Sequence, residues 1–387
     1  MILKWLFSRT VRHAFQMRKH VWKLLQHQRD ILAPPAIEAV TKAMDALRAT
    51  CATGDKAAVQ AGMDELEKVA NKCLRAYPNA GVRENIEVLL VAIAVAMGIR
   101  TFFLQPFKIP TGSMQPTLWG IHTDVLPPDF PIPNRVARFV EYWISGTSYE
   151  HVVAKTPGSF ETVEPPTRMA LFNLKQRFKV GDGVYTLWFP ADSVLENLSR
   201  QGFWYGTNGS PKEFKTGDDI LKLRVVSGDH LFVDRLTYNF RRPQRGEITV
   251  FETKHVVHQD VPKDQFYIKR LVGMSDEKLK IDQDRHLSVN HGQGWEQITA
   301  ATPHFENLYG QDTDTYTPNH YFRHHPMGLF ANEQSFDIPP NHYVVMGDNT
   351  MNSLDSRYWG SFPSSDVVGK AYFVYWPISS RFGWGYR

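Results

Sequence analysis

The chain is organised around one stretch, Phe107-Lys-Ile-Pro-Thr-Gly-Ser-Met-Gln-Pro-Thr117. It directly follows an apolar run at 86–104, which has the length needed to cross a bilayer. Its two prolines fix their own φ angles, and its glycine permits a close approach of the backbone. The stretch therefore predicts a rigid, exposed turn that presents Ser113 beside a membrane surface. The alternative for the stretch taken alone is an ordinary turn after a membrane helix, and the rest of the chain must decide.

Composition sets broad limits on the function. The 387 residues are 42% apolar and 22% charged, as in a folded protein of two or three domains. The net charge of +4 is mild, and no nucleic-acid motif accompanies it, so nucleic acid is not an expected partner. Both cysteines, Cys51 and Cys73, precede the apolar run, which excludes a disulfide framework after it.

Several histidines gather in the second half of the chain, but they lack the regular ligand spacing of a zinc site. We therefore expect no metal and no other cofactor. These histidines are His255, His258, His304, His320, His324 and His325.

The apolar run at 86–104 predicts a single transmembrane helix, with a buried core helix as the alternative. Its charged residues, Glu87 and Arg100, lie near its ends, where long side chains reach the interface. Lysine and arginine are abundant before the run and sparse just after it. The positive-inside rule then places residues 1–85 in the cytoplasm and the remainder outside.

Residues 1–85 predict helices without recognisable chemistry. The first thirty residues form a basic amphipathic pattern, which either lies on an anionic membrane or packs one face on a neighbouring helix. Apolar residues at helical spacing follow over 34–77, with a break at 53–55. We expect a helical hairpin there, serving as a scaffold or a docking site.

The exported part predicts a mainly β, antiparallel catalytic domain formed by 105–120 and 223–387. Short runs rich in β-branched and aromatic residues alternate with turn residues. These runs are 229–235, 246–251, 265–272, 278–282, 342–346 and 368–375.

Two stretches interrupt this domain: an inserted subdomain at 121–222 and a second insertion at 284–338. The first is rich in aromatic residues, for which core packing is favoured over a surface that binds peptide or glycan. They are Phe139, Tyr142, Trp143, Tyr185, Trp188, Phe189, Phe203, Trp204 and Tyr205.

Four stretches, in order, resemble the boxes of type I signal peptidases, the membrane-bound leader peptidases of bacteria. They are 109–117, 227–234 with 245–251, 267–273 and 347–360. The resemblance covers a minor part of the chain. It implies the signal-peptidase β fold and a serine endopeptidase that removes N-terminal signal peptides from exported precursors, cutting after small residues of the Ala-x-Ala type.

The resemblance makes Lys269 the general base, because a serine hydroxyl needs one and His230 has no catalytic role in the family. A free lysine has a pKa of about 10.4 and is charged at neutral pH. Burial among apolar neighbours such as Tyr267 and Leu271 lowers that pKa. A surface lysine at a strand edge is the alternative for this residue taken alone.

The family's other roles carry over by position. Ser113 is the nucleophile, its backbone N–H is half of the oxyanion hole, and Thr111 replaces the serine whose hydroxyl completes it. Ser353 matches the residue that orients the lysine. The expected substrate pockets are lined by Phe107, Ile109, Met114, Leu118, Tyr267 and Ile268. The expected structural ion pairs involve Asp348, Asp355, Arg270 and Arg357.

The resemblance also implies partners and a location. The expected partners are signal-peptide-bearing precursors, the lipid bilayer and, as a further candidate, the translocation machinery. The expected location is the bacterial cytoplasmic membrane, with an organelle inner membrane as the alternative. Three other hypotheses are a catalytically silent membrane-anchored scaffold, a Ser–Lys autoprotease of the repressor class, and a sorting enzyme for a restricted set of precursors.

Overall fold

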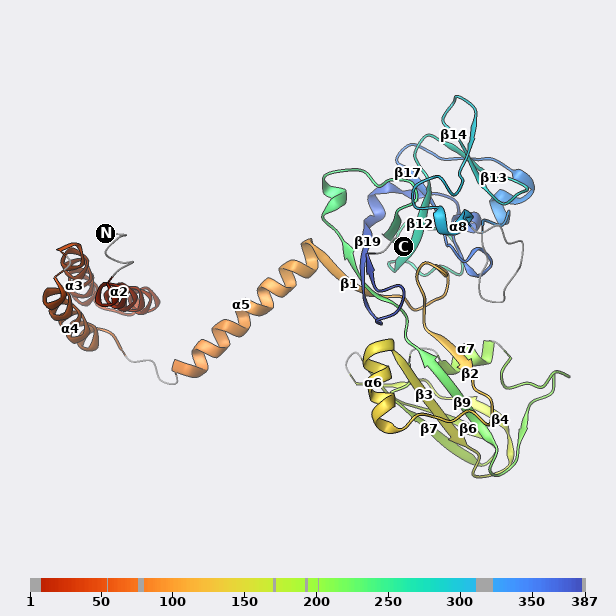
Figure 1. The fold of residues 1–387 in the computed structure, drawn as a ribbon, viewed down its shortest axis with the longest axis horizontal. Helices are drawn as coiled ribbons and strands as arrows, with labels where there is room; N and C mark the ends of the chain where they lie inside the picture. The colour runs from red at the N-terminus through yellow and green to blue at the C-terminus, as the bar shows by residue number, and fades with distance from the viewer. Residues whose placement is uncertain are drawn as a thin grey trace. The chain divides into compact units, whose positions relative to one another are not determined.

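The computed structural model describes residues 8–53, 55–75, 80–169, 172–191, 194–200, 202–310 and 323–384 (Figure 1). The chain forms two compact units, Met1–Ala94 and Val95–Arg387. Residues 1–7 of the basic N-terminal pattern, and His320, lie outside the described residues.

The N-terminal unit contains a small bundle of three helices: α2 (Arg9–Gln28), α3 (Pro34–Thr53) and α4 (Lys56–Cys73). The predicted hairpin is α3 and α4, and the Asp55 side chain caps the second helix by accepting from the Ala57 amide. The basic helix α2 packs one face on both partners, burying Val11, Val21 and Leu25. Of the two alternatives for this helix, packing on a neighbour is thus the one in the structure. Cys51 and Cys73 are free.

Helix α5 (Ala80–Phe102) contains the apolar run. Its segment Gly81–Phe102 has a mean hydropathy of 1.7, spans about 33 Å, and is the one helix in the described residues that is long and apolar enough to cross a membrane. The helix begins before 86, at Ala80, and Arg83 and Glu87 pair at 2.9 Å across one turn of its first part. It ends at Phe102, and strand β1 begins at Leu104.

An antiparallel sheet forms the frame of the second unit, as the mainly β prediction requires. Its strand order is β1-β10-β19-β11-β12-β17-β18, with β20 also paired to β19. The strands are β1 (Leu104–Lys108), β10 (His230–Asp234), β19 (Val367–Trp376), β11 (Ile248–Glu252), β12 (Phe266–Gly273), β17 (His342–Met346), β18 (Phe362–Pro363) and β20 (Gly383–Trp384). Short helical turns join them at η1 (Thr237–Asn239), η3 (Thr350–Asn352), α9 (Ser356–Trp359) and η4 (Ser364–Asp366).

The region around the second insertion folds onto this frame. A small sheet has the order β15-β14-β13-β16, and its apolar residues share a core with Val272 of β12 and Val344 of β17. Its elements are β13 (Lys278–Ile281), β14 (Leu287–Asn290), β15 (Trp295–Gln297), α8 (Glu306–Tyr309), η2 (Gly328–Glu333) and β16 (Phe336–Asp337).

The first insertion has a core of its own, centred on Trp204, whose ring stacks on Phe160 at 4.0 Å. Two antiparallel sheets enclose this core, with the orders β2-β9-β3 and β5-β6-β4-β8, and β7 pairs with β6. The elements are β2 (His122–Val125), α6 (Arg135–Ser145), β3 (Thr147–Val153), β4 (Gly158–Val163), β5 (Thr167–Met169), β6 (Phe172–Val180), β7 (Gly183–Trp188), α7 (Val194–Arg200), β8 (Glu213–Phe214) and β9 (Asp219–Val226).

The aromatic residues of this insertion divide into two groups. Tyr185, Phe203 and Trp204 pack in the core, as predicted. The prediction of core packing is wrong for the other six, which expose about half or more of their surface because they lie on α6, on strand ends or in turns. These are Phe139, Tyr142, Trp143, Trp188, Phe189 and Tyr205.

Candidate active site

The turn that carries Ser113 is held on both sides by backbone contacts. The Ile109 amide donates to the Asp229 carbonyl at 2.8 Å, and the Ser113 carbonyl accepts from the Asn349 amide at 3.0 Å. Glycine is required where the turn packs on its neighbours. A Cβ on Gly228 would lie 1.8 Å from the Ile109 carbonyl oxygen, and one on Gly120 would lie 2.2 Å from the Thr111 carbonyl carbon. The exposed turn expected from the sequence is therefore a tightly supported one, and Ser113 is 7% exposed.

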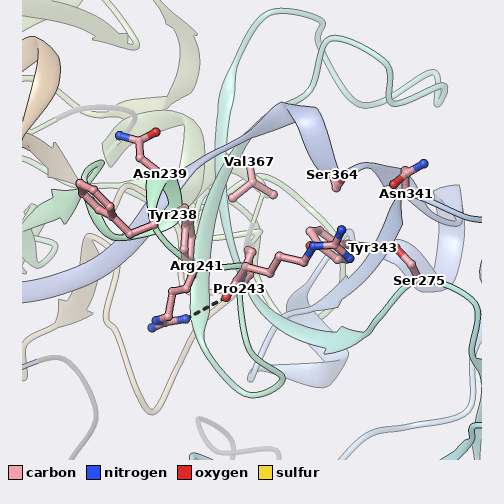
Figure 2. A pocket seen from close by; sticks show the side chains of 11 residues that line it. Tyr238, Asn239, Arg241, Pro243, Ser275, Asn341, Tyr343, Ser364 and Val367 are labelled. Atoms are coloured by element: carbon pink, nitrogen blue, oxygen red, sulfur yellow. Dashed lines mark hydrogen bonds between the residues drawn. The ribbon is translucent and has the colours of Figure 1, made fainter.

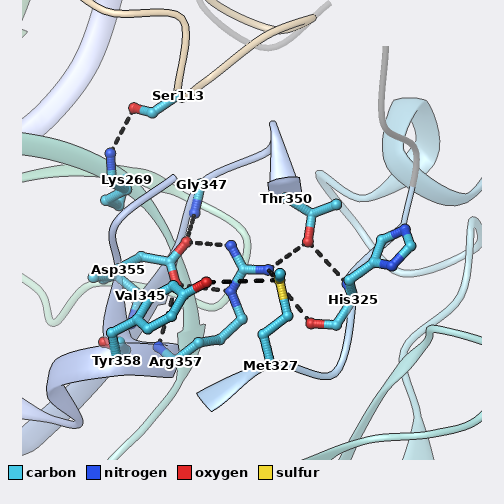
Figure 3. Close-up of polar contacts among 11 residues, drawn as sticks. Ser113, Lys269, His325, Met327, Val345, Gly347, Thr350, Asp355, Arg357 and Tyr358 are labelled. Atoms are coloured by element: carbon cyan, nitrogen blue, oxygen red, sulfur yellow. Dashed lines mark hydrogen bonds and ion pairs between the residues drawn. The ribbon is translucent and has the colours of Figure 1, made fainter. Parts of the chain in front are cut away.

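Lys269 lies on β12, opposite the buried Thr249 of β11. Its side chain is 5% exposed, and its Nζ donates to Ser113 Oγ at 2.6 Å (Figure 3). The Tyr267 ring lies 5.8 Å from the same nitrogen. The structure thus brings the expected nucleophile and the expected base into direct contact.

Burial lowers the pKa of Lys269 to about 8, because a charged ammonium loses its hydration there. Asp355 and Asp348 oppose this shift, and Arg357 supports it. At pH 7 a pKa near 8 leaves roughly a tenth of the lysine neutral, against about three parts in ten thousand at the ordinary value. The lysine can therefore accept a proton near neutral pH.

The two nearby carboxylates are each bound to an arginine. Arg270 Nη2 and Asp348 Oδ2 are 2.6 Å apart, and both side chains are buried. Arg357 Nη2 and Asp355 Oδ2 are 2.8 Å apart in a fully buried pair, which Figure 3 shows beside Gly347. Burial alone would raise the pKa of Asp355, but the charge and hydrogen bonds of Arg357 hold that pKa below its ordinary value. The four residues expected to form ion pairs do so.

The two accessory hydroxyls reach the site in different ways. Thr111 Oγ1 donates to Ser113 Oγ at 3.5 Å, at the outer limit of a hydrogen bond. Ser353 borders the same cleft and is buried, and its hydroxyl lies beside the Asp355 carboxylate, whose pKa it helps to hold below the ordinary value. The expected bond from Ser353 to the lysine stays a prediction.

A cleft of about 510 Å³ opens beside Ser113 and Lys269, and Tyr267 and Ile268 line it. The other expected pocket residues lie in or against the core next to the nucleophile turn: Ile109, Met114 and Leu118 are buried, and Phe107 packs against them. The sequence pattern identifies these as apolar positions near the serine, but it does not distinguish a pocket wall from the core behind it.

One wall of this cleft has an open strand edge. β12 pairs with β11 over Phe266–Arg270 but with β17 only over Arg270–Gly273. On that side the backbone of 266–268 has no ladder partner among the described strands, so an extended peptide could pair there.

A second cleft, of about 420 Å³, is lined by Arg241, Arg242 and Tyr343 among others (Figure 2). Its Ser275 hydroxyl donates to the backbone carbonyl of His342 at 3.0 Å, and no bond between it and a basic side chain is seen in the described part of the chain. Arg241 pairs with Glu247. The contact between a serine and a lysine therefore makes the cleft beside Ser113 the candidate active site. No group of three His, Cys, Asp or Glu side chains in the described ranges could hold a metal ion.

Sequence reasoning gave no role to two residues that hold the nucleophile turn. Asn349 Nδ2 donates to the Gly112 carbonyl at 3.0 Å. The fully buried Asp229 accepts from the Trp119 amide at 2.7 Å and from Arg381 Nε at 2.9 Å. Asn349 lies within the motif stretch 347–360 and Asp229 within 227–234. Their place in these stretches was the one sequence feature that pointed to a role near the site.

Comparison with known proteins places these features in a family. The model of the family "Signal peptidase, peptidase S26" matches residues 82–126 and 222–376. The chain belongs to this family. Its enzyme class is therefore that of a serine peptidase, signal peptidase I. The interval between the two matched segments corresponds closely to the first insertion, which is thus additional to the family's common fold.

Curated relatives of the chain are named as signal peptidases I. A probable signal peptidase I-2 of Synechocystis sp. is 30% identical over 39% of this chain and 56% of its own length. Signal peptidase I of Leptolyngbya laminosa is 28% identical over 56% of this chain and 89% of its own. A crystal structure of a signal peptidase I from Enterococcus faecalis is 25% identical and matches 34% of this chain and 97% of its own, with a TM-score of 0.22.

Proposed function

We propose that this protein is a membrane-anchored signal peptidase that cuts exported precursors through a Ser113–Lys269 dyad. The observation that carries the proposal is the 2.6 Å contact between Ser113 Oγ and the buried Lys269 Nζ at a cleft. A lysine whose pKa is lowered to about 8 by burial serves as a base for a serine hydroxyl, which is a poor nucleophile alone.

The reaction follows from these groups. Neutral Lys269 accepts the hydroxyl proton of Ser113 as the oxygen attacks the scissile carbonyl. The Ser113 backbone N–H and the Thr111 hydroxyl stabilise the oxyanion. Lys269 then returns the proton to the leaving amine, which breaks the peptide bond and leaves an acyl-enzyme. A water molecule, deprotonated by Lys269, hydrolyses that ester.

The substrate is proposed to bind as an added strand along 266–268, where the ladder of β12 is open. Tyr267 and Ile268 are then the walls of the substrate pocket. Met114 and Leu118 are buried in the core beside the nucleophile turn, and we infer that they limit the depth of the pocket. This packing supports a preference for small residues before the cut.

Helix α5 is the proposed anchor. Only Phe103 separates it from β1, so the catalytic sheet begins at the end of the span. This short connection supports cleavage next to the bilayer, where the end of a signal peptide emerges. The surplus of lysine and arginine before α5 supports a cytoplasmic N-terminal unit and an exported catalytic sheet in the bacterial cytoplasmic membrane.

The test is precursor processing by the full chain in detergent micelles, with mass spectrometry to locate the cut. We expect cleavage after a small residue by the wild type and none by Ser113→Ala, which removes only one oxygen. Retained folding of the variant is checked by its unfolding transition. Equal cleavage by Ser113→Ala would refute the dyad. Absence of cleavage by the wild type on every precursor would favour the silent-scaffold hypothesis.

A further inference from the structure

Helix α6 of the inserted subdomain turns its apolar face outward. Val136, Phe139, Val140 and Trp143 recur at the spacing that places residues on one side of a helix. These four side chains are between 47% and 74% exposed, and α6 has no buried residue. A surface helix of a water-soluble domain normally has the opposite arrangement.

The polar side of α6 faces the protein instead. Figure 1 shows the helix alongside β3, and the two elements are in contact. Arg138 lies near Glu150 of β3, and Glu141 lies beside Tyr149. Ser145 Oγ donates to Thr147 Oγ1 at 3.0 Å. Because these contacts fix which side faces inward, the exposed apolar side is a built feature of the subdomain.

The helix is also attached to the catalytic sheet. Trp376 Nε1, at the end of β19, donates to the Trp143 carbonyl at 2.8 Å, and the Ile378 amide donates to the Ile144 carbonyl at 2.7 Å. Gly146, with φ of 67°, ends the helix against the Trp376 ring, where a Cβ would lie 3.1 Å from it. Ile378, whose amide bonds the Ile144 carbonyl, also has an exposed side chain.

We propose that α6 lies in the membrane interface and is a second membrane contact of the enzyme, in addition to α5. This inference rests on the proposed membrane anchoring. The outward face combines Trp and Phe with aliphatic residues, the composition of interfacial helices. Arg135 is exposed at its start, while the single acid of the helix, Glu141, is turned toward β3. This charge distribution suits a bilayer containing anionic lipids.

The strand register gives the consequence for the active site. Leu104, next to α5, pairs with Asp234 at one end of β10, whereas Trp376, which holds α6, pairs with His230 at the other end. The two attachments are thus separated by the length of β10, roughly 13 Å. A bilayer that contacts both orients these strands along its surface and fixes the height of the Ser113 cleft above it.

A pair of matched probes tests the location of α6. The background is the full-length protein with Cys51→Ala and Cys73→Ala, to which either Val136→Cys or Val184→Cys is added. The new cysteine is labelled with an environment-sensitive fluorophore. The labelled protein is placed in nanodiscs of phosphatidylcholine and phosphatidylglycerol. Val184 is another exposed valine of the same subdomain, with 61% of its surface accessible against 74% for Val136, but it lies opposite Lys179, which pairs with Glu161 on a polar face. We expect brominated lipids to quench the probe at 136 and not the one at 184. Equal access of aqueous iodide to both probes would overturn the proposal. That result is also the one expected if α6 is covered by a partner protein in cells and not by lipid.

A second arm measures function separately. We expect Phe139→Glu to reduce precursor processing in nanodiscs by about tenfold, from the loss of one buried aromatic contact with lipid, and Val184→Glu to leave it unchanged. Cleavage of a short soluble peptide in detergent should be the same for both variants. Equal processing by both variants in nanodiscs would count against the proposal. If wild-type processing fails altogether, the proposed function fails, while the probe experiment still decides where α6 lies.

Discussion

Lys269 and Arg270 are adjacent residues of β12, and both are almost fully buried, yet their surroundings differ. Arg270 donates to both oxygens of Asp348 and to two backbone carbonyls. Lys269 has a serine hydroxyl as its hydrogen-bond partner and no carboxylate within ion-pair distance in the described residues. Burial with a bound counter-charge makes a structural cation. Burial without one lowers the pKa of Lys269 to about 8 and makes a base.

The largest expected effect comes from making Lys269 permanently charged or absent. Lys269→Arg keeps a cation that does not titrate, and Lys269→Met keeps the volume without a base. Both should reduce kcat/KM for a precursor peptide by about 10⁴-fold, because the serine loses its proton acceptor. Unfolding curves should show that both variants fold. Activity of Lys269→Arg within tenfold of the wild type would contradict the distinction between the two neighbours.

Removing the carboxylate of the buried Arg270–Asp348 pair should lower the stability of the fold. Asp348→Ala leaves Arg270 buried without its counter-charge, and we expect a loss of about 3–5 kcal/mol in the free energy of unfolding, measured by denaturant titration. Asp124→Ala is the matched control, because its partner Arg224 lies in an exposed pair. That pair should contribute less than about 1 kcal/mol. Similar losses of unfolding free energy in both variants would show that burial of the Arg270–Asp348 pair does not increase its contribution to stability.

The clamp on the nucleophile turn should affect rate more than stability. Asn349→Ala removes the donor to the Gly112 carbonyl and loosens the position of Ser113 relative to Lys269. We expect kcat/KM to fall by about 10- to 100-fold, mostly in kcat, since misplacement of reacting atoms is costly. Asn349→Asp is a useful comparison, because it keeps the shape but loses the amide donor and should be similarly slow. Unchanged kcat in both variants would show that Asn349 does not position the nucleophile turn.

The smallest expected effect concerns Ser353. If its hydroxyl orients Lys269 once substrate is bound, Ser353→Ala should lower kcat and shift the rising limb of the plot of kcat against pH. Ser353→Thr keeps a hydroxyl and should partly restore both kcat and the position of that limb. A Ser353→Ala variant with wild-type kcat and an unshifted pH profile would show that Ser353 only packs in the wall of the cleft. In this structure the Ser353 hydroxyl is buried beside Asp355, so the test separates a role toward Lys269 from one toward this carboxylate.

Much of the catalytic sheet could be predicted from local patterns. Alternating β-branched and aromatic runs locate β10, β12, β17 and β19 within a few residues, because each run is bounded by turn residues. The approach of Ser113 to Lys269, 156 residues apart in sequence, was expected only through the resemblance to a family. Physical reasoning on residues alone names a serine that needs a base but does not bring a distant lysine to it.

Other features depend on contacts that periodicity does not contain. The spacing on α6 shows an apolar face, but it does not tell which way that face turns, and tertiary contacts with β3 decide this. The same limit applies to Met114 and Leu118, apolar residues near the serine whose burial in the core beside the turn depends on tertiary packing. The support from Asn349 depends on where two separate loops meet, and its residue type alone does not reveal it.

The pH dependence of kcat/KM for the wild type on a short peptide in detergent tests the central claim most directly. Because neutral Lys269 is the active form, kcat/KM should rise tenfold per pH unit below the lysine pKa and level off above about pH 8. A midpoint near 8 supports a buried, unpaired lysine as the base. A profile that continues to rise beyond pH 10, or one that levels off near 6.5 as for a histidine, would contradict it.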